Sequence, residues 1–270
     1  MSPRLTAAHF DELSENGFVI IDRYISDEQC AQMAAALRRI LKPWDEVKND
    51  PPEERTACHY FPYSEQILNQ SIVDWEAIRF SQKWLGTNHV HYRPGISIVR
   101  YPGFKSGVRE AHIDNGNNSL LPPSTSDRSY GQINFWFYLE DVDEDQGPTQ
   151  FIATAHGQDM TRAVDMIGPA GTLAVFHNYT WHGAKGYRRD DGQKYIWKFA
   201  YGHADYYWEG VAHYTAVGAD PHFREFISGL SARGRRLRPR ECARTRRCAP
   251  PPAHRDRPTS ATRRDPCAHH

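Results

Sequence analysis

The sequence predicts a mainly β domain, a sandwich or barrel with flanking helices. From residue 88 onward, short runs rich in β-branched and aromatic residues are separated by Gly, Pro, Asn and Asp. Regularly spaced short strands of this kind are typical of sandwiches and barrels and not of βαβ units. The chain has no Gly-rich phosphate loop and no internal repeat. Its 270 residues, 39% hydrophobic and 12% aromatic, suffice for one well-buried domain.

The N-terminal region predicts a helix, a strand and a second helix. In LTAAHFDELSENG, Thr6 is a suitable N-cap and Gly17 a suitable C-cap. FVIIDRYI then forms a short β-branched strand. Ser26 begins a second helix over SDEQCAQMAAALRRIL, whose acidic first turn and basic last turn suit the helix dipole. A third helix is expected around residues 72–85, and loop and helix close the domain before Leu230.

Seven later runs are the expected strands of the sandwich: HVHYR, ISIVRY, REAHID, GQINFWFYLEDV, FIATAH, TLAVFH and KYIWKFAYG. Side chains alternate between the two faces of a strand. In GQINFWFYL, one face therefore carries a polar and aromatic set that is predicted to line a pocket, namely Gln132, Asn134, Trp136 and Tyr138. The other face carries an apolar set that is predicted to be the packed layer between the sheets, namely Ile133, Phe135, Phe137 and Leu139.

Charge divides the chain into a body and a tail. Lys+Arg and Asp+Glu both number 33. Residues 231–270 hold twelve Arg and three acidic residues, a balance of +9, so residues 1–230 carry −9. The tail has too few apolar residues to offset the entropy of ordering. We expect a domain over residues 1–230 and an Arg/Pro-rich, disordered tail over 231–270. A solvated extension is favoured over a nucleic-acid-binding one.

The sequence also bears on location. No stretch approaches 18 consecutive apolar residues, so no membrane partner is expected. The first residues lack an apolar signal core, and the number of cysteines, five, is odd. These features predict a cytoplasmic protein with reduced thiols.

The strongest chemical motif is Ala111-His112-Ile113-Asp114. In a strand, His112 and Asp114 point the same way, so they can supply two ligands of a metal site. The pair alone is common by chance, but its context is informative. His182 follows about 70 residues later, and Lys194 follows after 12 more. Two His and one carboxylate leave open positions on Fe(II), which suits an oxygenase.

Several segments, in the same order, resemble the phytanoyl-CoA dioxygenase family of Fe(II)/2-oxoglutarate oxygenases, from about residue 5 to 205. They are LTAAHFDELSENGFVIIDRYISDEQC, AHID, NFWFYLEDVDEDQGPTQFIATAH and GTLAVFHNYTWHGAKG. The resemblance implies a double-stranded β-helix (jelly-roll or cupin-like) core. It also implies that His112, Asp114 and His182 bind the iron.

The family likeness further implies a 2-oxoglutarate site. The family usually supplies an Arg for the distal carboxylate, and Lys194 takes that position here. Arg188 and Arg189, in the turn before the strand, are the alternative anchors. Ala184 stands where the family often has a Ser that contacts the same carboxylate. Asn134 and Trp136 are expected to lie nearest the cosubstrate. His177 is expected to be structural, and His156 is not expected to bind the metal.

The expected function is oxidation of a small organic substrate with O₂ and 2-oxoglutarate, releasing succinate and CO₂. Family-like halogenases lack the carboxylate that Asp114 provides, so hydroxylation, desaturation or ring formation is expected. Two alternatives stay open. One is a metal-binding cupin-like protein of another class, and the other is a non-catalytic binding protein.

Overall fold

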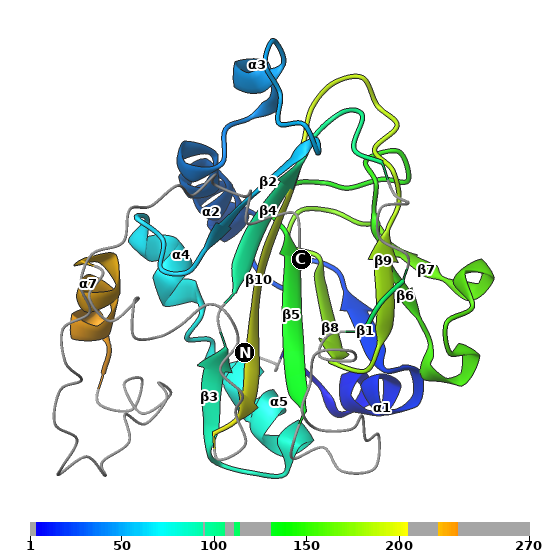
Figure 1. Ribbon diagram of the computed structural model, residues 1–270. Coiled ribbons are helices and arrows are strands. Elements are labelled where there is room, and N and C mark those ends of the chain that lie inside the picture. The colour runs from blue at the N-terminus through cyan, green and yellow to red at the C-terminus, as the bar shows by residue number, and fades with distance from the viewer. Residues whose placement is uncertain (1–3, 94, 106–110, 114–130, 205–220, 232–270) are drawn as a thin grey trace, which may run out of the picture.

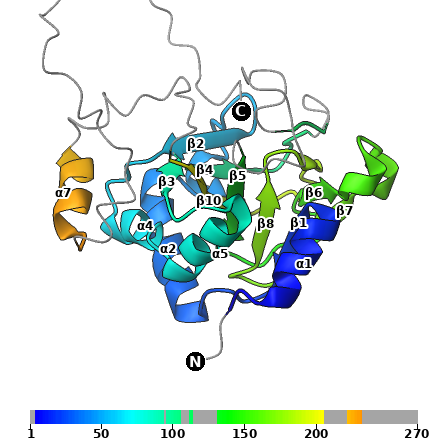
Figure 2. The ribbon, with the colours of Figure 1, turned by 90° about the horizontal axis from the view of Figure 1, so that it is seen from below.

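The computed structural model describes residues 4–93, 95–105, 111–113, 131–204 and 221–231. Two antiparallel sheets face each other, and helices cover the outer face of the larger sheet (Figures 1 and 2). This is the mainly β architecture with flanking helices that the sequence predicts. The predicted tail lies outside these residues except for Ser231, as does most of the polar stretch after the HxD motif.

The large sheet has seven strands in the order β1-β8-β5-β10-β4-β2, with β3 also pairing with β10. Its long central strand β10 pairs with β5, β4 and β3 and so connects most of the sheet. The sequence does not predict β2. The strands are β1 (Phe18–Ile21), β2 (Thr56–Tyr60), β3 (Val90–Arg93), β4 (Ile96–Arg100), β5 (Gln132–Tyr138), β8 (Leu173–His177) and β10 (Lys194–His203).

The small sheet has the order β7-β6-β9. It consists of β6 (Thr149–Ile152), β7 (Val164–Met166) and β9 (Trp181–Ala184). The chain passes directly from β8 in the large sheet to β9 in the small one, so a short turn joins the two layers. His112 extends the small sheet beyond β9 through an isolated antiparallel bridge to His182.

The predicted helix ends are confirmed. The Thr6 hydroxyl accepts a hydrogen bond from the His9 N–H at 3.3 Å, and Gly17 ends α1 with a φ of 84°. The Ser26 hydroxyl caps α2 by accepting from the Gln29 N–H at 3.2 Å. The α-helices are α1 (Ala7–Asn16), α2 (Asp27–Ile40), α3 (Trp44–Val47), α4 (Gln66–Ser71), α5 (Trp75–Leu85) and α7 (Pro221–Gly229); two 3₁₀ turns are η2 (Thr154–His156) and η3 (Met160–Arg162).

Two hydrophobic cores share the large sheet. The outer core lies between the helices and the sheet, where α2 and α5 residues such as Leu37 and Ile78 pack with aromatic residues of β5 and β10. The inner core lies between the two sheets, where Trp136 and Tyr138 pack with Phe151 and Met166. Burial of both cores supplies the main free energy that holds the layers together.

One sequence expectation about β5 is wrong. Ile133, Phe135, Phe137 and Leu139 belong to the outer core beneath the helices, not to the layer between the sheets. The alternation along the strand was correct, but the large sheet has a helical layer on one face. The helical layer and the second sheet both pack on apolar side chains. The alternation along the strand therefore does not show which face lies under the helices and which faces the second sheet.

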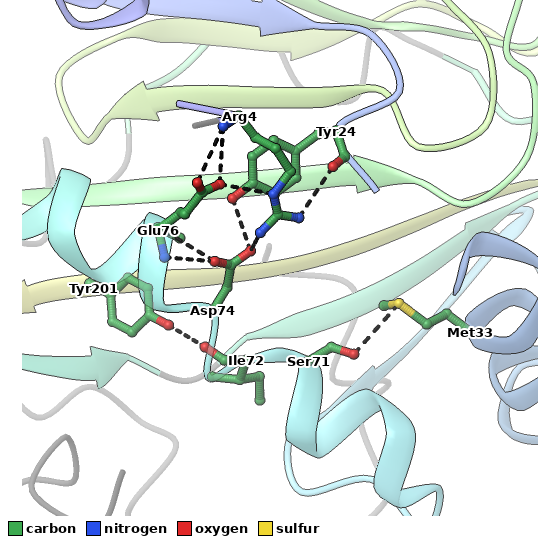
Figure 3. A network of polar contacts seen from close by, with 9 residues as sticks. Arg4, Tyr24, Met33, Ser71, Ile72, Asp74, Glu76 and Tyr201 are labelled. Atoms are coloured by element: carbon green, nitrogen blue, oxygen red, sulfur yellow. Dashed lines mark hydrogen bonds and ion pairs between the residues drawn. The ribbon is translucent and has the colours of Figure 1, made fainter. Parts of the chain in front are cut away.

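A polar network fixes the start of α5 to the N-terminal segment (Figure 3). The Asp74 carboxylate accepts from the Glu76 N–H at 2.8 Å, from the Tyr24 hydroxyl at 2.9 Å and from the Arg4 guanidinium at 2.9 Å. Arg4 also pairs with Glu76 at 2.8 Å. Nearby, the Tyr201 hydroxyl of β10 donates to the Ile72 carbonyl. The network therefore joins residues far apart in sequence at one edge of the outer core.

Within the described ranges, no helix is long and apolar enough to cross a membrane. Cys30 is a buried free thiol, in agreement with the reduced thiols that the sequence predicts.

Candidate functional site

The structure brings together His112 and His182, two histidines 70 residues apart in sequence. Their backbones exchange two hydrogen bonds, each of 2.9 Å from N to O. Their ring centroids are 4.4 Å apart, with the ring planes at 50°. Two imidazoles this close can bind one metal ion. Asp114, the third expected ligand, lies outside the described residues.

His182 is held in the tautomer that binds a metal. Its ring is 1% exposed, and its Nδ1 lies 3.0 Å from the Thr180 carbonyl oxygen. Because a carbonyl can only accept, Nδ1 carries the proton of this hydrogen bond. In the neutral imidazole the lone pair is then on Nε2. A metal-binding histidine is commonly oriented by such a hydrogen bond from its other nitrogen.

Aromatic side chains surround the His182 ring. The Trp136 indole lies edge-on to it, with centroids 5.2 Å apart at 89°, and the Phe176 ring is 4.9 Å away. The Phe151 ring is 6.2 Å away. These inner-core residues fix the ring and keep water from one side of it.

The donor set agrees with an Fe(II) site. Within the described ranges, no group of three His, Cys, Asp or Glu side chains could hold a metal. His112 and His182 supply two of the three expected ligands. Since Asp114 follows His112 by two residues, the chain offers the two-histidine, one-carboxylate set that non-haem Fe(II) oxygenases use.

Lys194 is a fully buried lysine at the start of β10. Its strand partner on β4 is Arg100, and its ammonium donates to the Gly147 carbonyl. Burial, with a further contribution from the Arg100 charge, lowers the pKa of Lys194 well below its usual value. None of the ion pairs among the described residues involves Lys194. A buried cation beside another cation is costly unless an anion joins them.

Asn134 and Trp136 are on the inner face of β5, facing the small sheet. Asn134 is 4% exposed; its carbonyl oxygen accepts from Gln132 Nε2 at 3.1 Å, while its Nδ2 makes no hydrogen bond to a described residue. The Lys198 ammonium lies 4.2 Å above the Trp136 ring. Trp136 thus contacts His182 on one side and a cation on another.

The other sequence candidates lie elsewhere. Arg188 pairs with Asp145 at 2.6 Å and Arg189 pairs with Asp143, and all four side chains are about half exposed. The His177 ring stacks on Trp84 with centroids 5.7 Å apart, away from the His112–His182 pair. A separate candidate, His156, is exposed in η2.

Sequence reasoning missed two polar residues around Lys194, namely Arg100 and Thr149, whereas Tyr138 belongs to the set predicted to line a pocket. The Lys194 ammonium is 5.6 Å from the Tyr138 ring centroid, and Tyr138 accepts a hydrogen bond from the Thr149 N–H at 2.8 Å. The alternation of β5 places Tyr138 on the pocket side. Arg100 and Thr149 could not be assigned because strand register is not readable from one sequence.

Comparison with known families agrees with this site. A family model for phytanoyl-CoA dioxygenase matches residues 13–193, about two thirds of the chain. The match includes both histidines of the pair, and it ends one residue before Lys194. No curated protein sequence matches the chain.

Solved structures with a similar fold are known. HygX from Streptomyces hygroscopicus, with nickel and 2-oxoglutarate bound, has a TM-score of 0.56 and 14% identity, covering 74% of this chain and 87% of its own. Its iron-bound structure has a TM-score of 0.54 and 13% identity, with the same coverage. SnoK, a non-haem α-ketoglutarate-dependent carbocyclase from nogalamycin biosynthesis, has a TM-score of 0.57 and 19% identity, covering 81% and 92%. At these identities the likeness supports a shared jelly-roll fold.

Proposed function

This chain belongs to the phytanoyl-CoA dioxygenase family of Fe(II)- and 2-oxoglutarate-dependent oxygenases, and we propose that it hydroxylates a small organic substrate. The iron would be held by His112, Asp114 and His182. The distal carboxylate of 2-oxoglutarate would be held by Lys194 with Arg100 beside it. Bound iron, 2-oxoglutarate and O₂ supply the oxidation, with succinate and CO₂ as co-products.

The observation that carries this proposal is the joint placement of two features on the inner side of the large sheet. One is the pair of imidazoles, with the His182 tautomer set by the Thr180 carbonyl. The other is the buried Lys194 opposite Arg100. A dicarboxylic oxo acid has one end that chelates a metal and another that carries a negative charge. Its binding therefore requires a metal site and a separate cationic side chain.

Each side chain has a definable task in this reaction. Thr180 orients the His182 ring through its carbonyl, and Trp136 and Phe176 pack against that ring and exclude water. Lys194 and Arg100 attract the carboxylate into a place with low dielectric, where a charge interaction is stronger than in water. Lys194 is proposed as the anchor in preference to Arg188 or Arg189, because the charges of both arginines are paired with surface acids.

Among the possible oxidations we propose hydroxylation, because Asp114 provides the carboxylate that family-like halogenases lack. Ring formation is a second candidate reaction, because the similar structure SnoK is described as a carbocyclase. Analysis of the oxidised product distinguishes the two: hydroxylation adds one oxygen atom, whereas oxidative ring closure removes two hydrogen atoms.

The test is an anaerobic titration of the protein with Fe(II) and 2-oxoglutarate. We expect a visible charge-transfer band that needs both additions and disappears in His182→Ala. On admission of O₂, succinate should form. Iron binding with no effect of 2-oxoglutarate would instead indicate a metal-binding cupin-like protein of another class. Absence of iron binding would indicate a non-catalytic binding protein.

A further inference from the structure

The C-terminal end of α1 is hydrogen-bonded to the turn that leads into His182. Thr180, the residue before β9, is 1% exposed, and its hydroxyl donates to the Gly17 carbonyl at 2.5 Å. The same carbonyl accepts a hydrogen bond from the His177 N–H at 3.3 Å. Because Gly17 is the residue that ends α1, a helix cap and the turn between the two sheets meet at one carbonyl oxygen.

This meeting point requires a glycine. Gly17 has a φ of 84°, a left-handed conformation that residues with a side chain rarely adopt. A Cβ at this position would lie 2.6 Å from the Thr154 hydroxyl oxygen and 3.1 Å from the Thr180 hydroxyl oxygen. The close approach of the turn to the end of α1 therefore depends on the absence of a side chain at residue 17.

Thr180 transmits this fixed position to His182. The Thr180 N–H donates to the His177 carbonyl at 3.0 Å, so the residue is held by its backbone and by its hydroxyl. Its own carbonyl oxygen lies 3.0 Å from Nδ1 of His182. The direction of this carbonyl therefore helps to set the direction of the His182 ring, and with it the Nε2 lone pair that would bind a metal.

Packing connects the same two regions. Phe18, which follows Gly17, is the strand partner of Phe176 and stacks on Phe151 with ring centroids 5.2 Å apart. The Phe151 and Phe176 rings both pack near the His182 ring. The end of α1 is thus connected to His182 by hydrogen bonds and by aromatic side chains.

We propose that Thr180 is a positioning residue for the metal site, and that its hydroxyl holds the His182 ring in place by joining it to the end of α1. This inference rests on the proposed function, in which His182 binds iron. Without the hydroxyl, the Thr180 carbonyl would still accept from His182, but the two groups would be free to turn together. The ligand would then be less preorganised, and ordering it on metal binding would cost more.

The test is calorimetric titration of the metal-free protein with Ni(II), below the thermal midpoint of every variant. Thr180→Val keeps the shape of the side chain and removes the hydroxyl. We expect its dissociation constant for Ni(II) to rise about tenfold, the lower end of the range for groups that orient metal ligands. Thr180→Ser, which keeps the hydroxyl, should bind within about twofold of the original protein. Thr180→Ala replaces Thr180→Val if the valine does not fold.

Thr154→Val is the matched control. The Thr154 hydroxyl donates to the Asn16 carbonyl at 3.3 Å, so it also joins a loop residue to the end of α1. Thr154 belongs to η2 and not to the turn before β9. Its loss should therefore leave the affinity for Ni(II) unchanged.

A second measurement needs no metal. The Nδ1 proton of the buried His182 ring, hydrogen-bonded to the Thr180 carbonyl, is protected from exchange with water, and proton NMR follows that exchange. We expect the exchange to be at least about tenfold faster in Thr180→Val than in the original protein. Thr154→Val should leave it unaltered.

The outcomes separate the inference from the proposed function. Equal affinity for Ni(II) in Thr180→Val and the original protein would overturn the inference, as would an equal loss in Thr154→Val. If the original protein does not bind Ni(II), the proposed function fails, whereas exchange of the ring proton still shows whether the Thr180 hydroxyl holds His182.

Discussion

The carbonyl oxygen of Thr180, just before β9, lies 3.0 Å from Nδ1 of His182, the second residue of that strand. This main-chain contact sets which ring nitrogen carries the proton, while Trp136 and Phe176 pack against the ring and hold it in place. The histidine is consequently presented by the backbone of the β8–β9 turn, and its position depends on the packing of the two sheets and not on a flexible partner.

We predict that His182→Ala abolishes iron binding, and that Asp114→Ala does the same. Each change leaves two of three ligands, and affinity falls with each lost donor. Iron content after anaerobic loading measures this. The control is His156→Ala, which alters an exposed histidine in η2 and should load fully. Full iron occupancy in both variants would contradict the assignment of His182 and Asp114 as iron ligands.

For the anchor, Lys194→Met is expected to raise the 2-oxoglutarate concentration needed for half-maximal succinate formation by at least about tenfold. Arg188→Ala should change it less than about twofold, because Arg188 is paired with Asp145 on the surface. Met retains much of the buried length and apolar character of Lys. A larger effect of Arg188→Ala than of Lys194→Met would indicate that the carboxylate is bound by the turn before β10.

The affinity for 2-oxoglutarate should fall as pH rises. Burial and Arg100 lower the pKa of Lys194, and only its protonated form attracts a carboxylate, so binding is strongest below that pKa. Calorimetry of the Ni(II)-loaded protein across neutral and alkaline pH measures the trend. In Lys194→Arg the dependence should be flat, because a guanidinium stays charged. An equal slope in both proteins would assign the titration to another group.

His91 is expected to make the fold less stable in acid. Burial, with the nearby Arg93 charge, lowers the pKa of His91 to about 3, against 6.5 for the unfolded chain. Between these values the unfolded state binds more protons, so the free energy of unfolding falls as pH drops from 6.5. Denaturant unfolding at a series of pH values should show a slope smaller by up to about 1.4 kcal/mol per pH unit in His91→Gln. The same change at exposed His156 should leave the slope unaltered.

Asp74→Ala should destabilise the outer core. The change removes the N-cap of α5 and leaves the buried Tyr24 hydroxyl without its acceptor. Together these losses cost about 2–4 kcal/mol, or roughly 10 °C in the thermal midpoint. Arg4→Ala, which removes two partly exposed ion pairs from the same network, should cost about 1 kcal/mol or less. Similar losses in both variants would show that the ion pair, not the cap, dominates.

The helix caps at Thr6 and Ser26 and most strands could be predicted because they depend on local sequence alone. β2 and β7 could not, because they are short and lie at sheet edges where pairing with a neighbour, not composition, creates the strand. The same limit applies to the site. His112, His182 and Lys194 are recognisable by type and spacing, whereas Arg100 and Thr149 enter only through the register of β4 and β6.

β5 and β10 each present one side to the helices and the other to the small sheet. Aromatic side chains such as Phe135 and Trp197 project toward the helices, whereas Trp136 and Tyr138 project toward the small sheet. Packing beneath the helices and the polar side chains of the candidate site thus use opposite sides of the same strands. A substitution of Lys194 should consequently leave the helical layer intact, so that its effect on ligand binding can be measured in a folded protein.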